Sequence, residues 1–482
     1  MTGPKNLAGG VALFVAMAGP TLAQNAIVTS SAAAGVRIAA TEPEPTSKDE
    51  LFGTPAPGAE KKDALFGAAD ASAEASGVKL SGWLDGLGAY TYADPVHWSR
   101  GVGRLYLAAQ GSMPENVKWK LSGRVDGDIV YATSNFYLEP VKVNQRFSAF
   151  WGENYLDFSA GSWDFRLGAQ QIIWGEVIGL FFADVVSARD EREFLLPSFD
   201  IIRIPQWAAR AEYFAGDSHL ELIWIPVPTF DRIGKPGADF YPAPLPSPTP
   251  ASVAALFLDP EKPSRNLSNS NYGVRANTLV SGWDLAAFYY RSESTQPTFY
   301  RLDTGNPEQP FVFQPRYDRI WQAGGTLSKD LGEMVLRAEM VYANGQGYAV
   351  TTPSAPQGVA FLSTFDYIVS AEWALPGDTR LNLQGFQRVF FDGGGRNNVI
   401  RSDGFGMGIF LSTKWTSTLE PQILWQQNFD HAGGLIRPRL NWYAAKNTAA
   451  GFGVDIFTGP SDGFFGRYNN RDRVYAELRY DF

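Results

Sequence analysis

Apolar and polar positions alternate most clearly near the end of the chain. Side chains on a strand point alternately to its two faces, so residues two apart share a face. From Asp472 to Phe482, one face carries Val474, Ala476, Leu478, Tyr480 and Phe482, and the other carries Arg473, Tyr475, Glu477, Arg479 and Asp481. Such alternation over about ten residues is typical of strands that present one face to lipid and the other to a lumen.

The same alternation recurs along the chain and predicts about 18 strands, within a range of 16–18. We expect them near residues 78–92, 102–112, 117–130, 147–160, 163–173, 206–215, 218–226, 271–280, 282–292, 316–328, 333–343, 364–374, 379–391, 403–414, 419–428, 434–445, 448–458 and 472–482. Short connections rich in Gly, Asn and Asp alternate with long ones, at 174–205, 227–270, 293–315, 344–363 and 391–402. A soluble β-sandwich does not predict this alternation. We therefore predict an all-β fold, a transmembrane antiparallel β-barrel with short periplasmic turns and long extracellular loops.

The first 76 residues differ in composition from the rest. The apolar run 7–18 follows Lys5 and precedes Thr21-Leu22-Ala23, which predicts a signal peptide over 1–23. Residues 24–76 are rich in Ala, Pro and Glu and are expected to form a disordered periplasmic segment before a barrel at 77–482.

A short repeat lies inside this segment. Lys48-Asp49-Glu50-Leu51-Phe52-Gly53 returns as Lys62-Asp63-Ala64-Leu65-Phe66-Gly67. Two interpretations stay open: a chance repeat in a biased linker, or a pair of anchors, Leu51-Phe52 and Leu65-Phe66, that bind a periplasmic partner or the barrel itself.

Composition argues against several classes of function. The chain has no cysteine, a net charge of −9 and three histidines. We expect no disulfide, no thiolate metal site and no nucleic-acid partner. His97, His219 and His431 are far apart in sequence with no paired nucleophile in view, so we also expect no enzyme activity, no metal site and no cofactor.

The long connection 174–205 combines charged and apolar residues. Such an apolar loop would be unfavourable in extracellular water, so we expect it to fold into the barrel and narrow it; a surface loop covering the barrel mouth is the alternative. The predicted constriction residues are Glu176, Asp184, Arg189, Asp190, Glu191, Arg192, Glu193 and Arg203. The predicted lumen-wall residues are Lys118, Lys120, Arg124, Asp126, Arg166, Arg210, Glu212, Arg337, Glu339, Glu477 and Arg479.

A family resemblance appears in the same region. Asp184-Val185-Val186-Ser187-Ala188-Arg189-Asp190, Arg192-Glu193 and Arg203-Ile204-Pro205 resemble the loop of the domain-of-unknown-function 1302 family. The resemblance implies a Gram-negative outer-membrane barrel associated with uptake or export of hydrophobic compounds. It implies no catalytic residues.

These observations predict an outer-membrane channel or transporter that passes small solutes or hydrophobic compounds past the 174–205 constriction. The alternative is the outer-membrane component of a multi-protein export or lipid-transport system, recruited through residues 48–67. The expected partners are outer-membrane lipid and lipopolysaccharide, a small-molecule cargo, and the barrel-assembly machinery, which would read Phe482 as an assembly signal. We expect export through the periplasm to the outer membrane.

Overall fold

The computed structural model describes residues 78–175, 177, 182–243, 255–305, 311–350, 355, 357–391, 404–430 and 432–482. All of them belong to one compact unit, residues 47–482. The predicted signal peptide, the 24–76 segment with its Leu-Phe repeat, and Glu176 lie outside the described residues.

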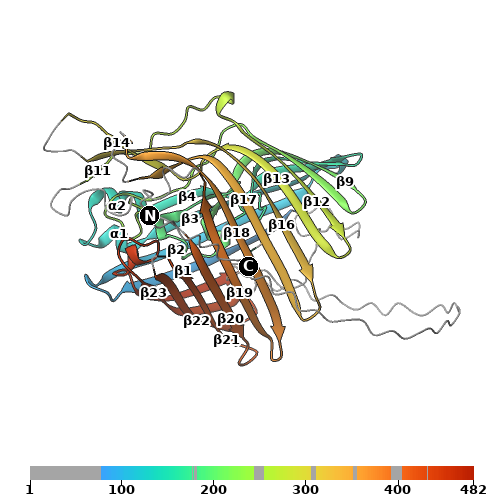
Figure 1. The fold of residues 1–482 in the computed structure, drawn as a ribbon. Coiled ribbons are helices and arrows are strands. Elements are labelled where there is room, and N and C mark those ends of the chain that lie inside the picture. The colour runs from blue at the N-terminus through green and yellow to red at the C-terminus, as the bar shows by residue number, and fades with distance from the viewer. Residues whose placement is uncertain are drawn as a thin grey trace, which may run out of the picture. The chain divides into compact units, whose positions relative to one another are not determined.

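The unit is a closed antiparallel barrel (Figure 1). Its sheet contains 19 strand segments, but β4 and β5 pair with successive parts of β3 and form one interrupted strand, which leaves 18. The segments are β1 (Lys79–Thr91), β2 (His97–Ser112), β3 (Lys118–Asp128), β4 (Phe147–Trp151), β5 (Asn154–Ala160), β6 (Trp163–Gln170), β9 (Gln206–Ala215), β10 (Ser218–Ile225), β12 (Asn271–Val280), β13 (Trp283–Glu293), β16 (Arg319–Asp330), β17 (Met334–Ala349), β18 (Val359–Leu375), β19 (Thr379–Phe390), β20 (Phe405–Thr413), β21 (Leu419–Asn428), β22 (Gly433–Ala445), β23 (Thr448–Thr458) and β24 (Arg473–Asp481). The predicted fold class and strand number are confirmed.

Closure joins the first and last strands. β24 pairs with β1 from Trp83↔Asp481 to Thr91↔Arg473. Phe482 continues this ladder, because its N–H donates to Gly82 O at 2.9 Å and its carbonyl accepts from Gly82 N at 2.8 Å. A barrel leaves no open sheet edge where its ladder is complete, and only such a sheet can satisfy its backbone groups in lipid.

The two faces of the wall differ as the alternation predicts. Leu121 and Leu478 lie outward with 56% of their surface exposed, whereas Glu212 and Glu339 point inward and are 1% and 2% exposed. The inward face of the wall therefore carries buried charged side chains.

Several smaller elements lie in the connections, and of these only the turn at Pro114–Asn116 was expected from the sequence. They are α1 (Ile129–Thr133), α2 (Glu139–Gln145), α3 (Phe199–Ile202), β7 (Ala188–Arg189), β8 (Arg203–Ile204), β11 (Leu256–Phe257), β14 (Thr298–Leu302), β15 (Val312–Arg316) and the 3₁₀ turns Pro114–Asn116, Glu191–Glu193, Leu267–Asn269 and Gly466–Tyr468. Their short length explains why periodicity missed them: a two- to seven-residue element shows barely one period. None of the described helices is long and apolar enough to cross a membrane.

Candidate functional site

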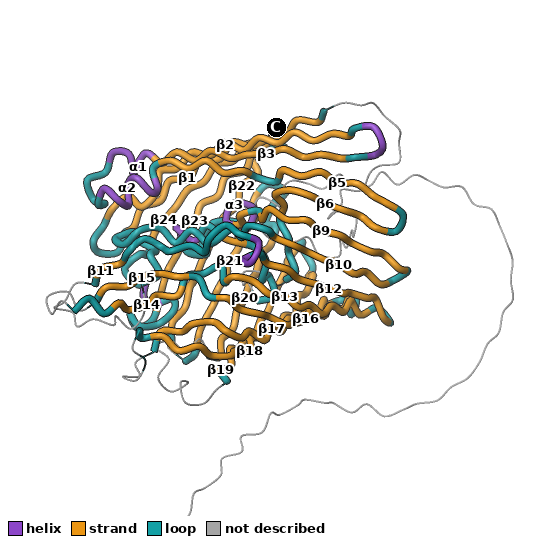
Figure 2. The backbone as a smooth tube through the Cα atoms, turned by 90° about the horizontal axis from the view of Figure 1, so that it is seen from above, coloured by secondary structure: helices purple, strands orange, loops and turns teal. Residues whose placement is uncertain are grey.

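Residues 171–205, which we call the lumen segment, connect β6 to β9 inside the barrel. Figure 2 shows α3 and the neighbouring loops surrounded by strands. The wall stays joined beneath the segment because Gln170 pairs with Gln206. Two amides hold the point of departure: Gln170 Nε2 donates to Ala208 O at 3.1 Å, and Gln206 Nε2 donates to Val186 O at 3.1 Å.

The segment first runs to β17 on the far wall. Glu339 of β17 accepts hydrogen bonds from Val177 N and Ala183 N, both at 2.8 Å. A Cβ at Gly175 would lie 2.8 Å from Asp184 N, so only glycine allows the outgoing and returning chains to approach this closely. Glu339 was predicted as a charge on the lumen wall; the structure places it beneath the lumen segment as an anchor.

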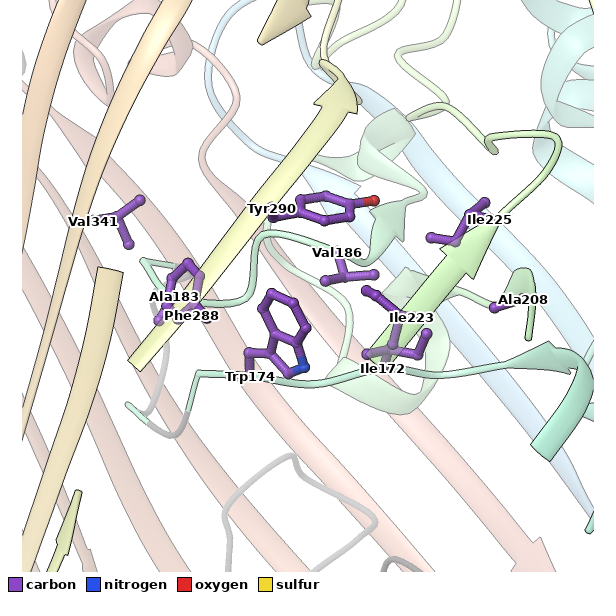
Figure 3. Packing of buried hydrophobic residues seen from close by; sticks show 10 residues of the cluster. All are labelled: Ile172, Trp174, Ala183, Val186, Ala208, Ile223, Ile225, Phe288, Tyr290 and Val341. Carbon is purple, nitrogen blue, oxygen red and sulfur yellow. The ribbon is translucent and has the colours of Figure 1, made fainter. Parts of the chain in front are cut away.

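An apolar cluster packs this part of the segment against the wall (Figure 3). Ile172, Trp174 and Val186 of the segment contact inward side chains of four strands, which are Ala208, Ile223, Ile225, Phe288, Tyr290 and Val341. Trp174 also donates from Nε1 to Glu221 Oε2 at 3.2 Å. Burial of so many large side chains stabilises the inward position of the segment.

The returning chain forms a small hairpin, β7 with β8. Arg203 donates from Nε to Asp184 Oδ2 at 3.1 Å, and Arg189 donates from Nη2 to Asp184 O at 2.6 Å. Arg192 makes two hydrogen bonds to Asp190, at 2.7 and 2.6 Å. The predicted constriction residues that lie in the described part of the chain are thus brought together, largely by pairing with one another.

Glu193 ties the segment to the opposite wall. Its carboxylate lies 2.7 Å from Arg100, 3.2 Å from Arg473 and 3.5 Å from Arg104. Burial opposes ionisation of Glu193, but the guanidinium groups of Arg100, Arg473 and Arg104 outweigh it and lower the pKa to about 2. Glu193 is therefore a carboxylate at any physiological pH.

Further contacts to this wall follow along the chain. Phe194 has a φ of +57°, and its ring lies in an aromatic cluster with Phe457, Phe465 and Tyr468. Backbone oxygens also take part: Leu196 O accepts from Arg437 at 2.9 Å, and Ile201 O accepts from Arg124 at 2.9 Å. The lumen segment is anchored from β17 to β24, on both sides of the barrel.

Two cavities lined by described residues border the segment. The larger is about 490 Å³ and is lined by Arg189, Glu191, Phe194 and Leu195 together with β16 to β19 and the 292–299 region. The smaller is about 130 Å³ and is lined by Glu193, Leu195, Leu196 and the arginines Arg104, Arg437, Arg439 and Arg473. Leu195 and Glu193–Phe194 stand between the two spaces.

Two carboxylates, Asp231 and Glu191, join the lumen segment to neighbouring connections. Asp231 accepts from Arg189 N at 2.7 Å and from Thr295 Oγ1 at 3.2 Å. Glu191 accepts from Gln296 Nε2 at 3.0 Å. Burial, and then the charge of Glu191, raises the pKa of Asp231 to about 8, while burial raises the pKa of Glu191.

The predicted wall residues point inward, and most are paired. The pairs are Lys120–Glu153 (2.7 Å), Arg124–Asp126 (2.9 Å), Arg166–Asp157 (2.6 Å), Arg210–Glu212 (2.7 Å), Arg337–Glu372 (3.0 Å), Arg439–Glu477 (2.7 Å) and Arg479–Asp200 (2.9 Å). Lys118 lies exposed at the end of β3. Of these pairs, Arg479–Asp200 connects the wall to the lumen segment.

The sequence reasoning missed the three arginines around Glu193. Arg473 shares the polar face of the last strand, and Arg104 shares an inward face with Asp85, its partner at 2.5 Å. Alternation therefore indicates that both side chains face inward, but it does not show that they pair with Glu193. Among the described residues, no group of three or more His, Asp or Glu side chains is placed to hold a metal ion.

Comparison with known proteins supports the fold and decides the family. The family model described as "Protein of unknown function (DUF1302)" matches residues 134–482, well over half of the chain. The chain belongs to this family. The match extends well beyond Asp184 to Pro205, the stretch that carried the resemblance in sequence.

Solved outer-membrane proteins share the architecture of this DUF1302 member at very low identity. OccAB2 of Acinetobacter baumannii matches at 8% identity over 85% of this chain and 99% of its own, with a TM-score of 0.50. OccK8 (OprE) of Pseudomonas aeruginosa matches at 11% identity over 84% and 98%, with a TM-score of 0.49. A search of curated protein sequences finds no match.

Proposed function

We propose that this DUF1302 protein is an outer-membrane channel or transporter in which the lumen segment forms the constriction between two chambers. The observation that carries the proposal is the anchoring of one segment to opposite walls, through Glu339 on β17 and Glu193 against β2 and β24. A segment fixed at both ends of its path restricts passage without closing off the space on either side. The proposal gives the chain no catalytic role.

The larger cavity favours an amphipathic cargo. Its aromatic lining includes Phe182, Phe299, Tyr348, Phe386 and Phe464, and polar amides and hydroxyls stand among them at Gln296, Thr298, Gln322, Gln346 and Thr364. Ligand sites of this kind bind through apolar surface and are oriented by a few polar groups. We therefore include hydrophobic compounds with polar substituents among the solutes it passes.

The test is single-channel conductance of the purified full chain in planar bilayers. Replacing Leu195 by Ala removes side-chain volume between the two cavities, so Leu195→Ala should raise the conductance. The control is Leu285→Ala. Leu285 lies on β13, is 38% exposed and faces away from the lumen. Equal conductance of the two variants and the wild type would remove Leu195 from the path.

Ion selectivity tests the charges of the constriction. Arg189 lines the larger cavity, whereas Arg192 points to Asp190, Asn144 and Ser148 and lines neither cavity. In a salt gradient, Arg189→Gln should shift the reversal potential toward cations, while Arg192→Gln should leave it near the wild-type value. A shift with Arg192→Gln alone would contradict the proposed path.

A further inference from the structure

The inward course of the lumen segment leaves a gap in the strand pairing of the barrel wall, which we call the window. β5 pairs with β6 only as far as Asn154↔Ala169, and β6 ends at Gln170. β4 continues the wall beyond that level but pairs with β3 alone. Among the described residues, no backbone hydrogen bond joins the second edge of β4 to another element.

The cause of the window is visible in the chain that would have filled it. Residues 171–175 follow β6 and would extend it beside β4, but Ile172 and Trp174 turn into the apolar cluster on the lumen side of β10 and β13. The last link is Gln171 N, which donates to Glu153 Oε1 at 3.2 Å. The window therefore lies between β4 and the start of β9.

Its outer border is apolar and aromatic. Phe147 and Trp151 of β4 are 63% and 77% exposed, and Trp207 of β9 is 54% exposed. An unpaired strand edge in hydrocarbon costs several kcal/mol per unsatisfied group. The free edge of β4 thus favours a neighbour with polar groups at its own level over acyl chains alone.

Its inner side is cationic. The ring of Phe150 lies 4.4 Å from the guanidinium carbons of both Arg124 and Arg232, and 5.9 Å from that of Arg192. Arg124 and Arg192 are neutralised by Asp126 and Asp190. Arg232 is exposed and forms no ion pair or side-chain hydrogen bond with the described residues, although the charges of Asp190 and Asp126 act on it. Three arginines thus face two carboxylates, so the group behind the window keeps a net positive charge.

We propose that the window binds the headgroup of a phosphate-bearing anionic membrane lipid. The phosphate pairs with Arg232 and accepts hydrogen bonds from the free edge of β4, and the acyl chains lie against Phe147, Trp151 and Trp207. Arginine suits this task because its planar guanidinium binds phosphate through two parallel hydrogen bonds. The inference rests on the proposed outer-membrane location but not on transport.

The test measures lipid binding to the purified full chain in detergent by native mass spectrometry. The probes are phosphatidylglycerol, diacylglycerol with the same chains, and glycerol phosphate, which has the head without chains. We expect phosphatidylglycerol to bind, and Arg232→Gln to weaken it roughly tenfold, the effect of one charge-assisted pair. The matched control is Arg265→Gln, an exposed arginine in the same connection between β10 and β12.

Three outcomes overturn the proposal: unchanged phosphatidylglycerol binding in Arg232→Gln, an equal loss in Arg265→Gln, or equally tight binding of diacylglycerol. Tight binding of glycerol phosphate would show that the acyl chains do not contribute to binding. Trp151→Ser tests the apolar border independently and should also weaken phosphatidylglycerol binding. Conductance of these variants is measured separately, so a failed lipid site and a failed channel give different results.

Discussion

At the residue scale, Glu193 shows what decides the position of the lumen segment. One carboxylate lies against three arginines, two from β2 and one from β24. Removing one member of a buried ionic group leaves the others uncompensated and typically costs about 3–5 kcal/mol. The segment is thus held by charge at one wall and by backbone hydrogen bonds to Glu339 at the other.

We predict that Glu193→Gln loosens the segment and makes the channel conduct more, with larger fluctuations in single-channel recordings. The matched control is Glu372→Gln, which removes a buried carboxylate held by Arg337 and Arg380 but with no contact to the segment. Glu372→Gln should lower thermal stability without changing conductance. A Glu193→Gln channel with wild-type recordings would argue against this anchor.

The raised pKa of Asp231 predicts that the stability of the β7–β8 hairpin depends on pH. Its ordinary value of 3.8 is raised to about 8 in the folded chain, so folding takes up a proton. The resulting stabilisation is complete below about pH 4 and is lost as the pH rises through about 8. Above that pH the charges of Asp231 and Glu191 repel each other, and the hairpin should exchange its amide hydrogens several-fold faster.

Hydrogen exchange measured by mass spectrometry at pH 6 and pH 9 checks this. Asp231→Asn keeps an acceptor for Arg189 N but cannot ionise, so its peptides should lack the additional exchange at pH 9. Comparing the two proteins at each pH removes the intrinsic pH dependence of exchange. Equal exchange in both proteins at pH 9 would count against ionisation of Asp231.

At the scale of elements, sequence alternation predicted the wall and failed for the segments inside it. The last strand has its expected faces, because lipid and lumen impose opposite polarity on successive residues. The hairpin β7–β8 and helix α3 have no such pattern, since both of their sides contact protein. The position of 174–205 inside the barrel was inferred from its apolar residues. Its partners could not be inferred in this way, because they come from strands far away in sequence, as Arg100 does for Glu193.

The last residue, Phe482, gives a prediction about the closure of the final strand. Its ring would lie 2.8 Å from a Cβ at Gly82, and its backbone makes two hydrogen bonds with the same residue. We predict that Phe482→Ser lowers the amount of membrane-inserted barrel several-fold, while Phe482→Tyr, which keeps an aromatic ring, stays near the wild type. Quantitative blots of outer-membrane fractions measure this. Similar levels for Ser and Tyr would show that the aromatic side chain is not the assembly signal.

The Leu-Phe repeat before the barrel is tested by substitution. Changing Leu51, Phe52, Leu65 and Phe66 to Ser should leave barrel insertion unchanged and abolish capture of a periplasmic partner by the purified chain, if the repeat is an anchor. Four Ser substitutions elsewhere in 24–76 serve as the control. An unchanged set of co-purified proteins would favour the chance repeat.

At the scale of the whole molecule, one departure of the chain from the wall has two effects. The segment that leaves β6 packs inside the barrel, and the same departure leaves β4 without its second partner. Counting strands in the sequence predicts a closed barrel, but it assumes that every strand pairs with both neighbours along its whole length. The window could not be predicted, because 163–173 shows the same alternation whether its last residues stay in the sheet or turn inward.

The arginines that bind Glu193 also set an order of events during assembly. Arg100 and Arg104 lie on the second strand and Arg473 on the last, on either side of the seam where β24 meets β1. The complete cluster therefore exists only after the two ends of the sheet have met. Docking of the lumen segment and closure of the sheet stabilise each other, so a barrel that fails to close also fails to hold its lumen segment against β2 and β24.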